Sequence, residues 1–279
     1  MSSIGVVSVN IMGGLGNQMF QLATAYAYAK QNNGKLIVLK NKKEPDGRSL
    51  YWDNMLYRFQ DFLVDRLPEG LEQWHESGAT EFSIITSLTN KGLYINGYLQ
   101  SPKYFGDSII QDEIRELFKP SSTTIYNIQS RYNLLLKNKD RVIVVHARRT
   151  DYLTNQDIIN FHGPLSIDYY NKAISIMSNE IEDPIFILAA DDPSFWGSVI
   201  NELPQLNNRN IYILDDDNEI STLALLQQFQ YFIIANSTFS WWAAWLSKDT
   251  KKVIAPSKWF GPTGPQNYKD IYMPSWELI

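Results

Sequence analysis

Two adjacent arginines, Arg148 and Arg149, have the residue type and spacing of an anion-binding site. They follow the apolar run RVIVV at 141–145, which predicts a buried strand. A charge beside a buried strand is costly unless an opposite charge accompanies it, and a planar guanidinium matches phosphate oxygens two at a time. The pair therefore predicts a phosphate site. The alternative is a structural ion pair with Asp151 or Asp157.

An arginine at a diphosphate could also promote the breaking of a bond to it. The departing diphosphate gains negative charge, so a guanidinium aimed at that charge stabilises the transition state more than the ground state. Removal of a proton from an attacking hydroxyl would add about 10²–10⁴-fold in rate. Asp151 and Asp157 are the candidate general bases, although Asp151 could instead orient an arginine. The candidate catalytic residues are Arg148, Arg149, Asp151 and Asp157.

A glycine-rich turn at 13–17 (GGLGN) lies between an apolar run and a helical pattern. Glycines let a ligand approach the backbone, and the amides at a helix N-terminus point toward an anion or a sugar hydroxyl. The turn lacks the full spacing of the dinucleotide-binding fingerprint. Gly14, Gly16 and Asn17 are therefore candidate ligand contacts, and a plain tight turn is the alternative.

A second polar turn follows the apolar run at 232–235. Asn236, Ser237 and Thr238 offer side-chain groups and backbone amides that could form a phosphate cradle opposite the arginines. The three tryptophans at 241, 242 and 245 have helical spacing, which favours a core position over sugar stacking.

Aspartates follow two further predicted strands. Asp191 and Asp192 come after the run at 185–189, and Asp215-Asp216-Asp217 comes after 211–214. Carboxylates in these places could contact a base or ribose, bind a divalent metal between diphosphate oxygens, or cap the next turn.

The elements that must position these residues alternate between strands and helices. Strands are predicted at 6–12, 36–39, 141–145, 185–189, 211–214, 232–235 and 253–255, and helices at 17–30, 109–118, 169–176 and 222–229. This alternation is typical of parallel sheets, which bind ligands beyond the carboxyl ends of their strands. We therefore predict an α/β fold of two Rossmann-like halves, 1–135 and 136–279, with a cleft between them. The less regular stretch 41–105 is where we expect the N-terminal half to bind an acceptor.

Composition excludes several kinds of protein. Hydrophobic residues make up 44 % and charged residues 20 % of the 279 residues, and the net charge is −5, so we expect a folded domain without a nucleic-acid partner. The absence of cysteine and the presence of three histidines argue against disulfides, thiolate catalysis and a zinc site. No apolar run has the ~18–20 residues of a membrane helix, so we expect a soluble cytoplasmic protein without a transmembrane segment.

Together the motifs resemble the α-1,2-fucosyltransferases of glycosyltransferase family 11. The resemblance covers nearly the whole chain, in the strings GGLGNQMFQ (13–21), GYLQSPKYF (97–105), HARRTDY (146–152), LSIDYYNKAI (165–174), FILAADD (186–192), IIANSTFSWWAAWL (233–246) and APSKWF (255–260). Long exact strings such as ANSTFSWW are highly specific.

The resemblance implies a GT-B-like fold and inverting transfer of L-fucose from GDP-fucose to a glycan hydroxyl, with the 2-hydroxyl of a galactoside as acceptor and an α-1,2 linkage as product. It implies no cofactor and no metal. It places Arg148 and Arg149 on the diphosphate, His146 near the nucleotide, and Asn17 toward donor and acceptor. The candidate donor contacts are His146, Gly14, Gly16, Asn17, Asp191, Asp192, Asn236, Ser237, Thr238 and Phe239.

Two departures from the family pattern bear on the nucleotide. Ala190 stands where the family usually has serine, and Thr222 stands where relatives often carry an aspartate that could contact the base. One alternative is therefore a transferase that uses another GDP- or UDP-linked deoxyhexose. Others are a metal-dependent transferase that uses Asp215-Asp216-Asp217 and a non-catalytic sugar-binding protein.

Overall fold

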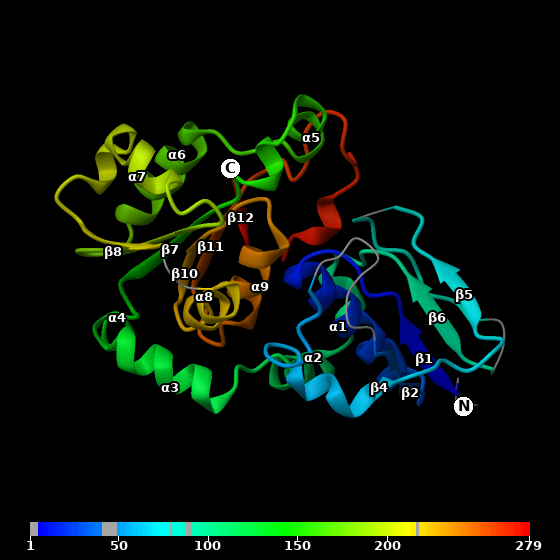
Figure 1. Cartoon of the computed structure of the whole chain (residues 1–279). Helices are drawn as coiled ribbons and strands as arrows, with labels where there is room; N and C mark the ends of the chain where they lie inside the picture. Colours follow the sequence, from blue (N-terminus) through cyan, green and yellow to red (C-terminus); the bar gives the residue numbers. More distant parts are fainter. Residues whose placement is uncertain (1–4, 41–48, 79, 88–90, 216–217) are drawn as a thin grey trace. The chain divides into compact units, whose positions relative to one another are not determined.

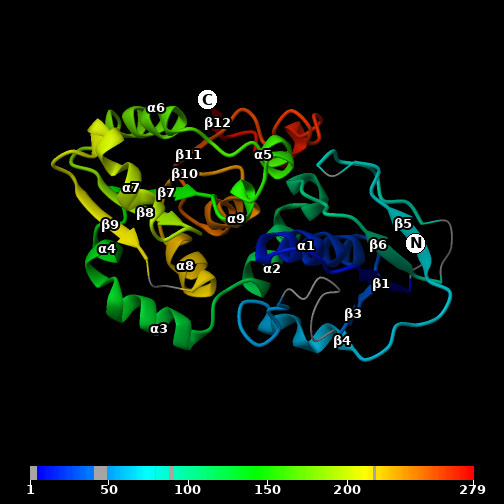
Figure 2. The ribbon, with the colours of Figure 1, turned by 45° about the horizontal axis from the view of Figure 1, so that its top comes forward.

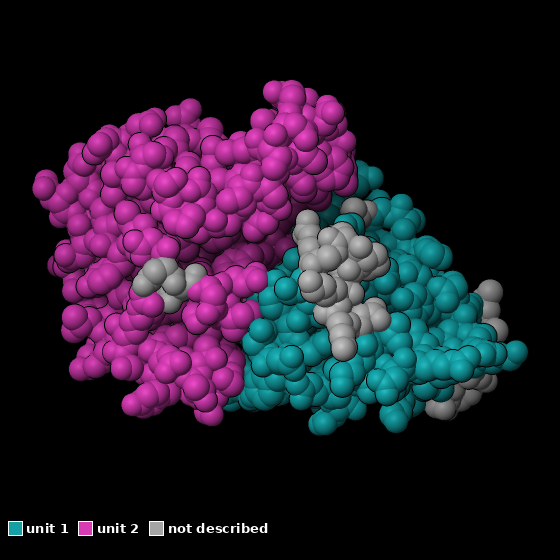
Figure 3. All heavy atoms as spheres, in the orientation of Figure 1, with its two compact units in different colours: residues 1–119, 267–273 teal, residues 120–266, 274–279 magenta. Residues whose placement is uncertain are grey.

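The chain divides into two units, each built on a parallel β-sheet. The computed structural model describes residues 5–40, 49–78, 80–87, 91–215 and 218–279. Unit 1 comprises residues 1–119 and 267–273, and unit 2 comprises residues 120–266 and 274–279 (Figure 3). The chain thus returns to unit 1 for seven residues near its end and then re-enters unit 2. No helix among the described residues has the length and apolar character needed to cross a membrane.

Unit 1 contains a four-stranded parallel sheet with strand order β2-β1-β6-β5. Its strands are β1 (Val6–Val9), β2 (Lys35–Leu36), β5 (Glu72–His75) and β6 (Leu93–Asn96). A separate parallel pair consists of β3 (Val38–Leu39) and β4 (Leu63–Val64). The strand predicted at 36–39 is therefore divided at Ile37 between two sheets. Strands β5 and β6 lie in the stretch that the sequence left without a regular pattern.

The described part of unit 1 also contains two helices and three 3-10 segments. They are α1 (Leu15–Gln31), α2 (Ser108–Leu117) and the 3-10 segments η1 (Tyr57–Phe62), η2 (Pro102–Phe105) and η6 (Lys269–Ile271). Helix α1 follows β1 directly and packs against it (Figures 1 and 2). Gly13 has φ +80°, and a Cβ there would lie 2.5 Å from Asn17 Nδ2, so the turn requires glycine at this position.

Unit 2 contains a six-stranded parallel sheet with strand order β12-β11-β10-β7-β8-β9. Its strands are β7 (Val142–Ala147), β8 (Ile185–Ala190), β9 (Asn210–Leu214), β10 (Tyr231–Ile233), β11 (Lys252–Ala255) and β12 (Glu277–Leu278). Counted from β7, the spatial order is 6-5-4-1-2-3, which is the doubly wound order of Rossmann folds. The predicted strand at 141–145 continues through His146 and Ala147, and all of β7 is buried.

The helices of unit 2 cover both faces of this sheet. They are α3 (Ser122–Arg131), α4 (Asn133–Lys137), α5 (Gln156–His162), α6 (Ile167–Ser178), α7 (Phe195–Val199), α8 (Glu219–Leu226) and α9 (Thr238–Leu246), with the 3-10 segments η3 (Asp151–Leu153), η4 (Ile200–Glu202) and η5 (Pro204–Leu206). Helices α6 and α7 lie on one face, and α8 and α9 on the other (Figures 1 and 2).

The division between the units falls between Lys119 and Pro120, whereas the sequence pattern predicted it between residues 135 and 136. The reason is helix α3, which packs against α8 and therefore belongs to unit 2. Segment 267–273 is the second difference. It lies in unit 1, where the Thr80 and Ser101 hydroxyls donate to the backbone carbonyls of Asn267 and Asp270.

The core of unit 2 contains the three tryptophans that were predicted to lie in a core. Trp241 and Trp242 are fully buried, and Trp245 is 4 % exposed, so the prediction of a core position is confirmed. On the other face of the sheet Tyr170 and Trp196 pack against each other, with ring centroids 5.1 Å apart. Burial on both faces gives β7 and β8 their continuous apolar sequences.

The Gln21 side chain holds the backbone that enters the glycine-rich turn. Its amide nitrogen donates to the Met12 carbonyl at 3.1 Å, and its amide oxygen accepts from the Met12 amide at 3.0 Å. We predict that Gln21→Met lowers the free energy of unfolding by about 1–3 kcal/mol, because it fills the same space but leaves both groups of Met12 unpaired. Urea unfolding measures the loss. The control is Gln31→Met on the exposed end of the same helix, and an equal effect of both variants would contradict the assignment.

Candidate functional site

The two polar segments predicted to bind phosphate lie together at the topological switch point of unit 2. Strands β7 and β10 are neighbours in the sheet, and the chain leaves them toward opposite sides. Ligands of open α/β sheets bind beyond the carboxyl ends of the strands at such a point. Arg148 and Arg149 follow β7, and Asn236 to Thr238 follow β10. Two contacts join the segments, the rings of His146 and Phe239 at 5.3 Å and a hydrogen bond of 3.0 Å from Tyr152 Oη to the Asn236 carbonyl.

Arg148 is held by two carboxylates. Its Nε and Nη2 donate to the two oxygens of Asp151 at 2.9 and 2.8 Å, and Nε lies 3.1 Å from Asp191 Oδ2. Burial lowers the pKa of Arg148, but the hydrogen bonds to Asp151 and the charges of Asp191 and Asp151 more than offset this and raise it. The structural ion pair that the sequence allowed is therefore present. It leaves the arginine side chain 29 % exposed.

Asp191 organises the backbone that carries both arginines. Its Oδ1 accepts from the Arg149 amide at 2.7 Å, and its Oδ2 accepts from the Thr150 amide at 3.1 Å and from the Thr150 hydroxyl. Asp192 has a different role, because its Oδ1 accepts from the Ser194 amide at 2.9 Å and the Ser194 hydroxyl at 2.7 Å. These bonds lower the pKa of Asp192 and cap the turn after β8.

Arg149 is directed to other partners than Arg148. Its Nη1 donates to the Leu165 carbonyl at 3.1 Å, and its guanidinium lies 4.6 Å from the ring centre of Phe195. Its Nε is buried and has no hydrogen-bond partner among the described residues. Arg149 therefore keeps a donor that the surrounding protein does not satisfy, which is the condition under which a ligand oxygen would be favourable.

His146 is neutral in this site. The side chain is 3 % exposed, and burial lowers its pKa to about 4 against the opposing charge of Asp191, with a further lowering by Arg148. Its Nδ1 is buried without a partner among the described residues. The positive charge available to an anion near β7 at neutral pH therefore comes from the arginines.

The turn after β10 is fixed by Asn236. The side chain is 2 % exposed, and its Nδ2 lies within hydrogen-bond distance of three carbonyls, those of His162 at 2.7 Å, Gly163 at 3.2 Å and Trp259 at 3.0 Å. Asn236 thus fastens two loops to the end of the strand. Ser237 is the N-cap of α9, and its side chain makes no capping hydrogen bond. The amides at the start of this nine-residue helix favour an anion by the direction of the helix dipole.

The remaining predicted residues belong to unit 1 and to helix α5 of unit 2. Gly14, Gly16 and Asn17 belong to unit 1, where Asn17 Oδ1 accepts from Gln100 Nε2 at 2.9 Å. Asp157 is exposed in the first turn of α5, and within the described ranges it forms no hydrogen bond to either arginine.

The acidic triplet after β9 is described only in part. Asp215 is exposed at the end of the edge strand, while Asp216 and Asp217 lie outside the described residues. Within the part of the chain that the structure describes, no group of three or more His, Asp and Glu side chains is arranged to hold a metal ion. Thr222 lies partly buried in α8.

Several site residues were not singled out by the sequence. The Tyr152 ring stacks on His162 with centroids 4.0 Å apart and planes 10° apart, and Phe195 lies against Arg149. Tyr152 and Gln100 fall within the strings HARRTDY and GYLQSPKYF, so the motifs themselves were the available signal. His162 and Phe195 carry no comparable signal, because only the tertiary fold brings them to the arginine segment.

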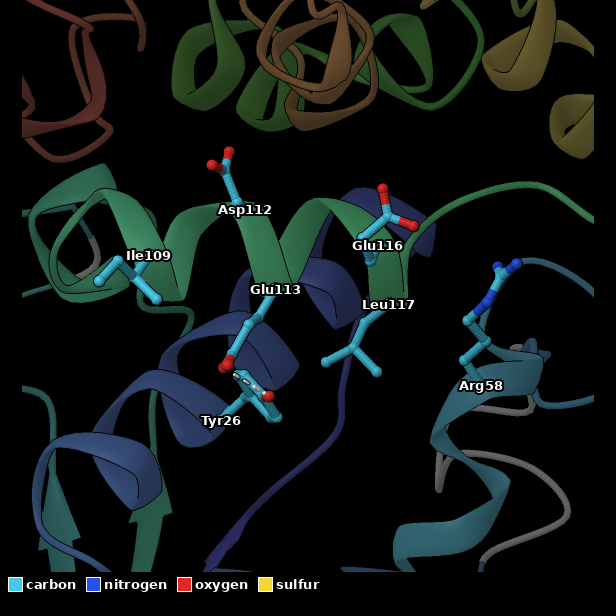
Figure 4. Close-up of a pocket in the computed structure, with 7 residues that line it drawn as sticks. All are labelled: Tyr26, Arg58, Ile109, Asp112, Glu113, Glu116 and Leu117. Carbon is cyan, nitrogen blue, oxygen red and sulfur yellow. Dashed lines mark hydrogen bonds between the residues drawn. The ribbon is translucent and has the colours of Figure 1, made fainter.

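A hollow of about 580 Å³ in unit 1 contains none of the predicted residues. It is lined by Tyr26, Arg58, Ile109, Asp112, Glu113, Glu116 and Leu117. Figure 4 shows Glu113 pointing from α2 to Tyr26 of α1, whose hydroxyl donates to Glu113 Oε2 at 2.8 Å. This bond and the Lys30 ion pair of Glu113 join the two helices.

The fold is shared with a solved structure. The crystal structure of POFUT1 in complex with GDP-fucose superposes with a TM-score of 0.53 at 13 % identity, covering 90 % of this chain and 97 % of that chain. Two Rossmann-like halves with parallel sheets define a GT-B-like fold, as the sequence predicted.

The chain belongs to glycosyl transferase family 11, whose model matches residues 1–279. It is similar to the O-antigen biosynthesis glycosyltransferase WbnK of Escherichia coli, at 28 % identity over 95 % of this chain and 98 % of that protein. It is also similar to the alpha-1,2-colitosyltransferase of Escherichia coli, at 27 % identity over 92 % of this chain and 93 % of that protein. A third relative is the galactoside 2-alpha-L-fucosyltransferase SEC1 of Bos taurus, at 24 % identity over 90 % of this chain and 67 % of that protein. The protein is therefore a glycosyltransferase, which sets aside the non-catalytic alternative.

Asp191 and its neighbour Asp192 offer a matched pair of substitutions. We predict that Asp191→Ala lowers the free energy of unfolding by about 2–3 kcal/mol, because the Arg149 and Thr150 amides and Arg148 lose their shared acceptor. Asp192→Ala should cost little, since it removes only the bonds to Ser194. Chemical denaturation of both variants measures the difference. Equal stabilities would show that Asp191 does not organise the arginine segment.

Proposed function

We propose that this glycosyltransferase transfers L-fucose from GDP-fucose to a hydroxyl of a glycan, with inversion and formation of an α-1,2 linkage. The 2-hydroxyl of a galactoside is the proposed acceptor. The observation that carries the proposal is the convergence of Arg148, Arg149 and the N-terminus of α9 at the switch point of unit 2. Family membership and the names of the α-1,2-linking relatives support the sugar and the linkage.

The proposed reaction is a single displacement. An acceptor oxygen forms a bond to the anomeric carbon of fucose while the bond from that carbon to the diphosphate oxygen breaks, and its electron pair leaves with GDP. The hydroxyl proton of the acceptor is released. Arg148 is suited to the growing charge on the diphosphate, because Asp151 and Asp191 hold its guanidinium in place before the substrate arrives. Arg149 and the α9 amides would share that charge.

Asp151 and Asp157 are not equally suited to act as the general base. Both oxygens of Asp151 accept from Arg148, which supports an orienting role for this carboxylate. Asp157 is exposed and forms no hydrogen bond to Arg148 or Arg149 within the described ranges, which leaves it the candidate base of the two. We propose that transfer needs no cofactor and no metal ion, because arginines and helix amides supply the charge stabilisation at the diphosphate.

A second candidate donor is GDP-colitose. The observation that favours it is the 27 % identity to an alpha-1,2-colitosyltransferase over 92 % of the chain. Colitose is fucose without its 3-hydroxyl, so the choice depends on whether the site binds that hydroxyl. A site built to hydrogen-bond a hydroxyl rejects the analogue that lacks it by about 10⁴–10⁵-fold.

Donor choice is tested by transfer assays with GDP-fucose, GDP-colitose and UDP-linked sugars against a glycan array, with the linkage of any product determined. We expect GDP-fucose to give an α-1,2-linked galactoside, with GDP but not UDP raising the melting temperature. Full activity in EDTA is expected for a metal-independent reaction. Preferred use of GDP-colitose would establish the second candidate, and dependence on UDP sugars would contradict both.

Arg148 is expected to be required for turnover. We predict that Arg148→Ala lowers kcat by about 10²–10³-fold, the usual effect of removing a donor to a developing negative charge. Arg148→Lys should also lose at least tenfold, because an ammonium does not reproduce the two-pronged geometry. The matched control is Arg141→Ala, since Arg141 forms its ion pair with Asp183 at the opposite end of β7. Activity of Arg148→Ala within a few-fold of wild type, in a folded protein, would overturn the proposed role.

A further inference from the structure

Glu76, which follows strand β5, forms hydrogen bonds to the turn that follows strand β6. Its Oε2 accepts from the backbone amides of Tyr98 at 2.8 Å and Leu99 at 3.1 Å, while its own amide donates to the Asn96 carbonyl at 2.8 Å. Both strands end at the carboxyl edge of the unit 1 sheet, because β5 and β6 pair in parallel. A carboxylate that accepts two backbone amides forms charge-assisted bonds, which are about twice as strong as neutral ones.

The turn at 97–100 has a conformation that needs such support. Leu99 has φ +56°, a left-handed conformation that costs a leucine energy, and its side chain is fully buried. Gly97 lies so close to Glu76 that a Cβ on it would be 2.5 Å from Glu76 Cβ and 2.6 Å from Glu76 Oε2. The carboxylate and the buried leucine therefore fix the path of this turn.

The turn in its fixed path places Gln100 against the glycine-rich turn. Gln100 is 8 % exposed, and its Nε2 donates to Asn17 Oδ1 at 2.9 Å. Asn17 lies in the first turn of α1 and also contacts Gly13, whose missing Cβ makes room for its amide. A continuous series of hydrogen bonds and backbone thus leads from Glu76 to Asn17, through residues that are all in unit 1.

The charge of Glu76 is sensitive to pH near neutrality. Burial raises the pKa of Glu76 to about 7, although the two amide bonds act in the opposite direction. Its second oxygen, Oε1, is buried without a hydrogen-bond partner among the described residues. The titratable group that faces it is Tyr104, whose pKa is raised mainly by burial and also by the charges of Glu76 and Asp270. Asp270 is itself paired with Lys103.

We infer that Glu76 is a positioning residue of the transfer reaction, which sets the side chain of Asn17 for a substrate hydroxyl through the 97–100 turn and Gln100. The inference rests on the proposed function and on the family resemblance, which places Asn17 toward donor and acceptor. The ionised carboxylate holds the turn most firmly, so substrate binding should strengthen as pH rises through about 7. Glutamine at this position keeps the shape of glutamate but loses the charge.

The test compares Glu76→Gln with Glu69→Gln, the same chemical change at a side chain of unit 1 that is 87 % exposed. GDP-fucose is the donor and lactose is the galactoside probe. We expect Glu76→Gln to raise the KM for lactose by about fivefold at pH 8, the difference between charged and neutral hydrogen bonds, with a smaller change in kcat. The wild-type KM should rise as pH falls through about 7, and the KM of Glu76→Gln should be independent of pH.

A double-mutant cycle with Asn17→Ala separates positioning from a general structural role. If Glu76 acts through Asn17, Glu76→Gln has no further effect on KM in the Asn17→Ala background. Amide hydrogen exchange, which needs no acceptor, should become faster at 97–100 and 13–18 in Glu76→Gln but not in Glu69→Gln. Unchanged exchange in these segments, or an unchanged KM and pH profile in a folded variant, would overturn the inference.

GDP affinity distinguishes this outcome from failure of the proposed function. The arginine segment lies in unit 2, so Glu76→Gln should bind GDP as the wild type does in isothermal titration calorimetry. A wild-type protein that neither binds GDP nor transfers fucose would contradict the proposed function. Wild-type transfer with no response to Glu76→Gln would contradict only the role of Glu76.

Discussion

The candidate site depends on one carboxylate, that of Asp191. It stands just after β8 and accepts from the Arg149 amide, the Thr150 amide and the Thr150 hydroxyl, while the Arg148 guanidinium lies 3.1 Å away. Two adjacent guanidiniums just after a buried strand repel each other and lose hydration, so the segment is stable only with such a partner. The same carboxylate orders the backbone and balances the charge, and this leaves the site organised before any substrate binds.

The rest of unit 2 keeps that arrangement rigid. Strand β7 behind it is wholly buried, and the Asn236 side chain donates to the carbonyls of His162, Gly163 and Trp259 at the end of β10. His146 is held neutral by burial and its ring packs on Phe239, so it adds no positive charge to the site. Catalytic power in group transfer comes largely from dipoles and charges that need no reorganisation during the reaction. A site that is held at the edge of a packed sheet satisfies that condition.

The sequence could predict where the strands end, but not which strands and side chains lie beside those ends. Apolar runs located β7, β8 and β10, because a parallel strand buried on both faces has a continuous apolar sequence. That β7 lies beside β10 depends on strand order, which no local pattern contains. The Leu165 carbonyl and the Phe195 ring reach Arg149 only through tertiary packing. Strands β5 and β6 escaped prediction because they lie among polar and aromatic residues without a clear apolar pattern.

The late return of the chain to unit 1 has a consequence for biosynthesis. Residues 267–273 supply Asp270, which accepts from the Phe82 amide at 3.0 Å and pairs with Lys103, and the last residues form β12 on the edge of the other sheet. Domains usually fold in order of synthesis, the N-terminal one first. Here neither unit has all its parts until residues 267–279 have been synthesised. The two units must therefore complete folding at nearly the same time, although their sequences are translated one after the other.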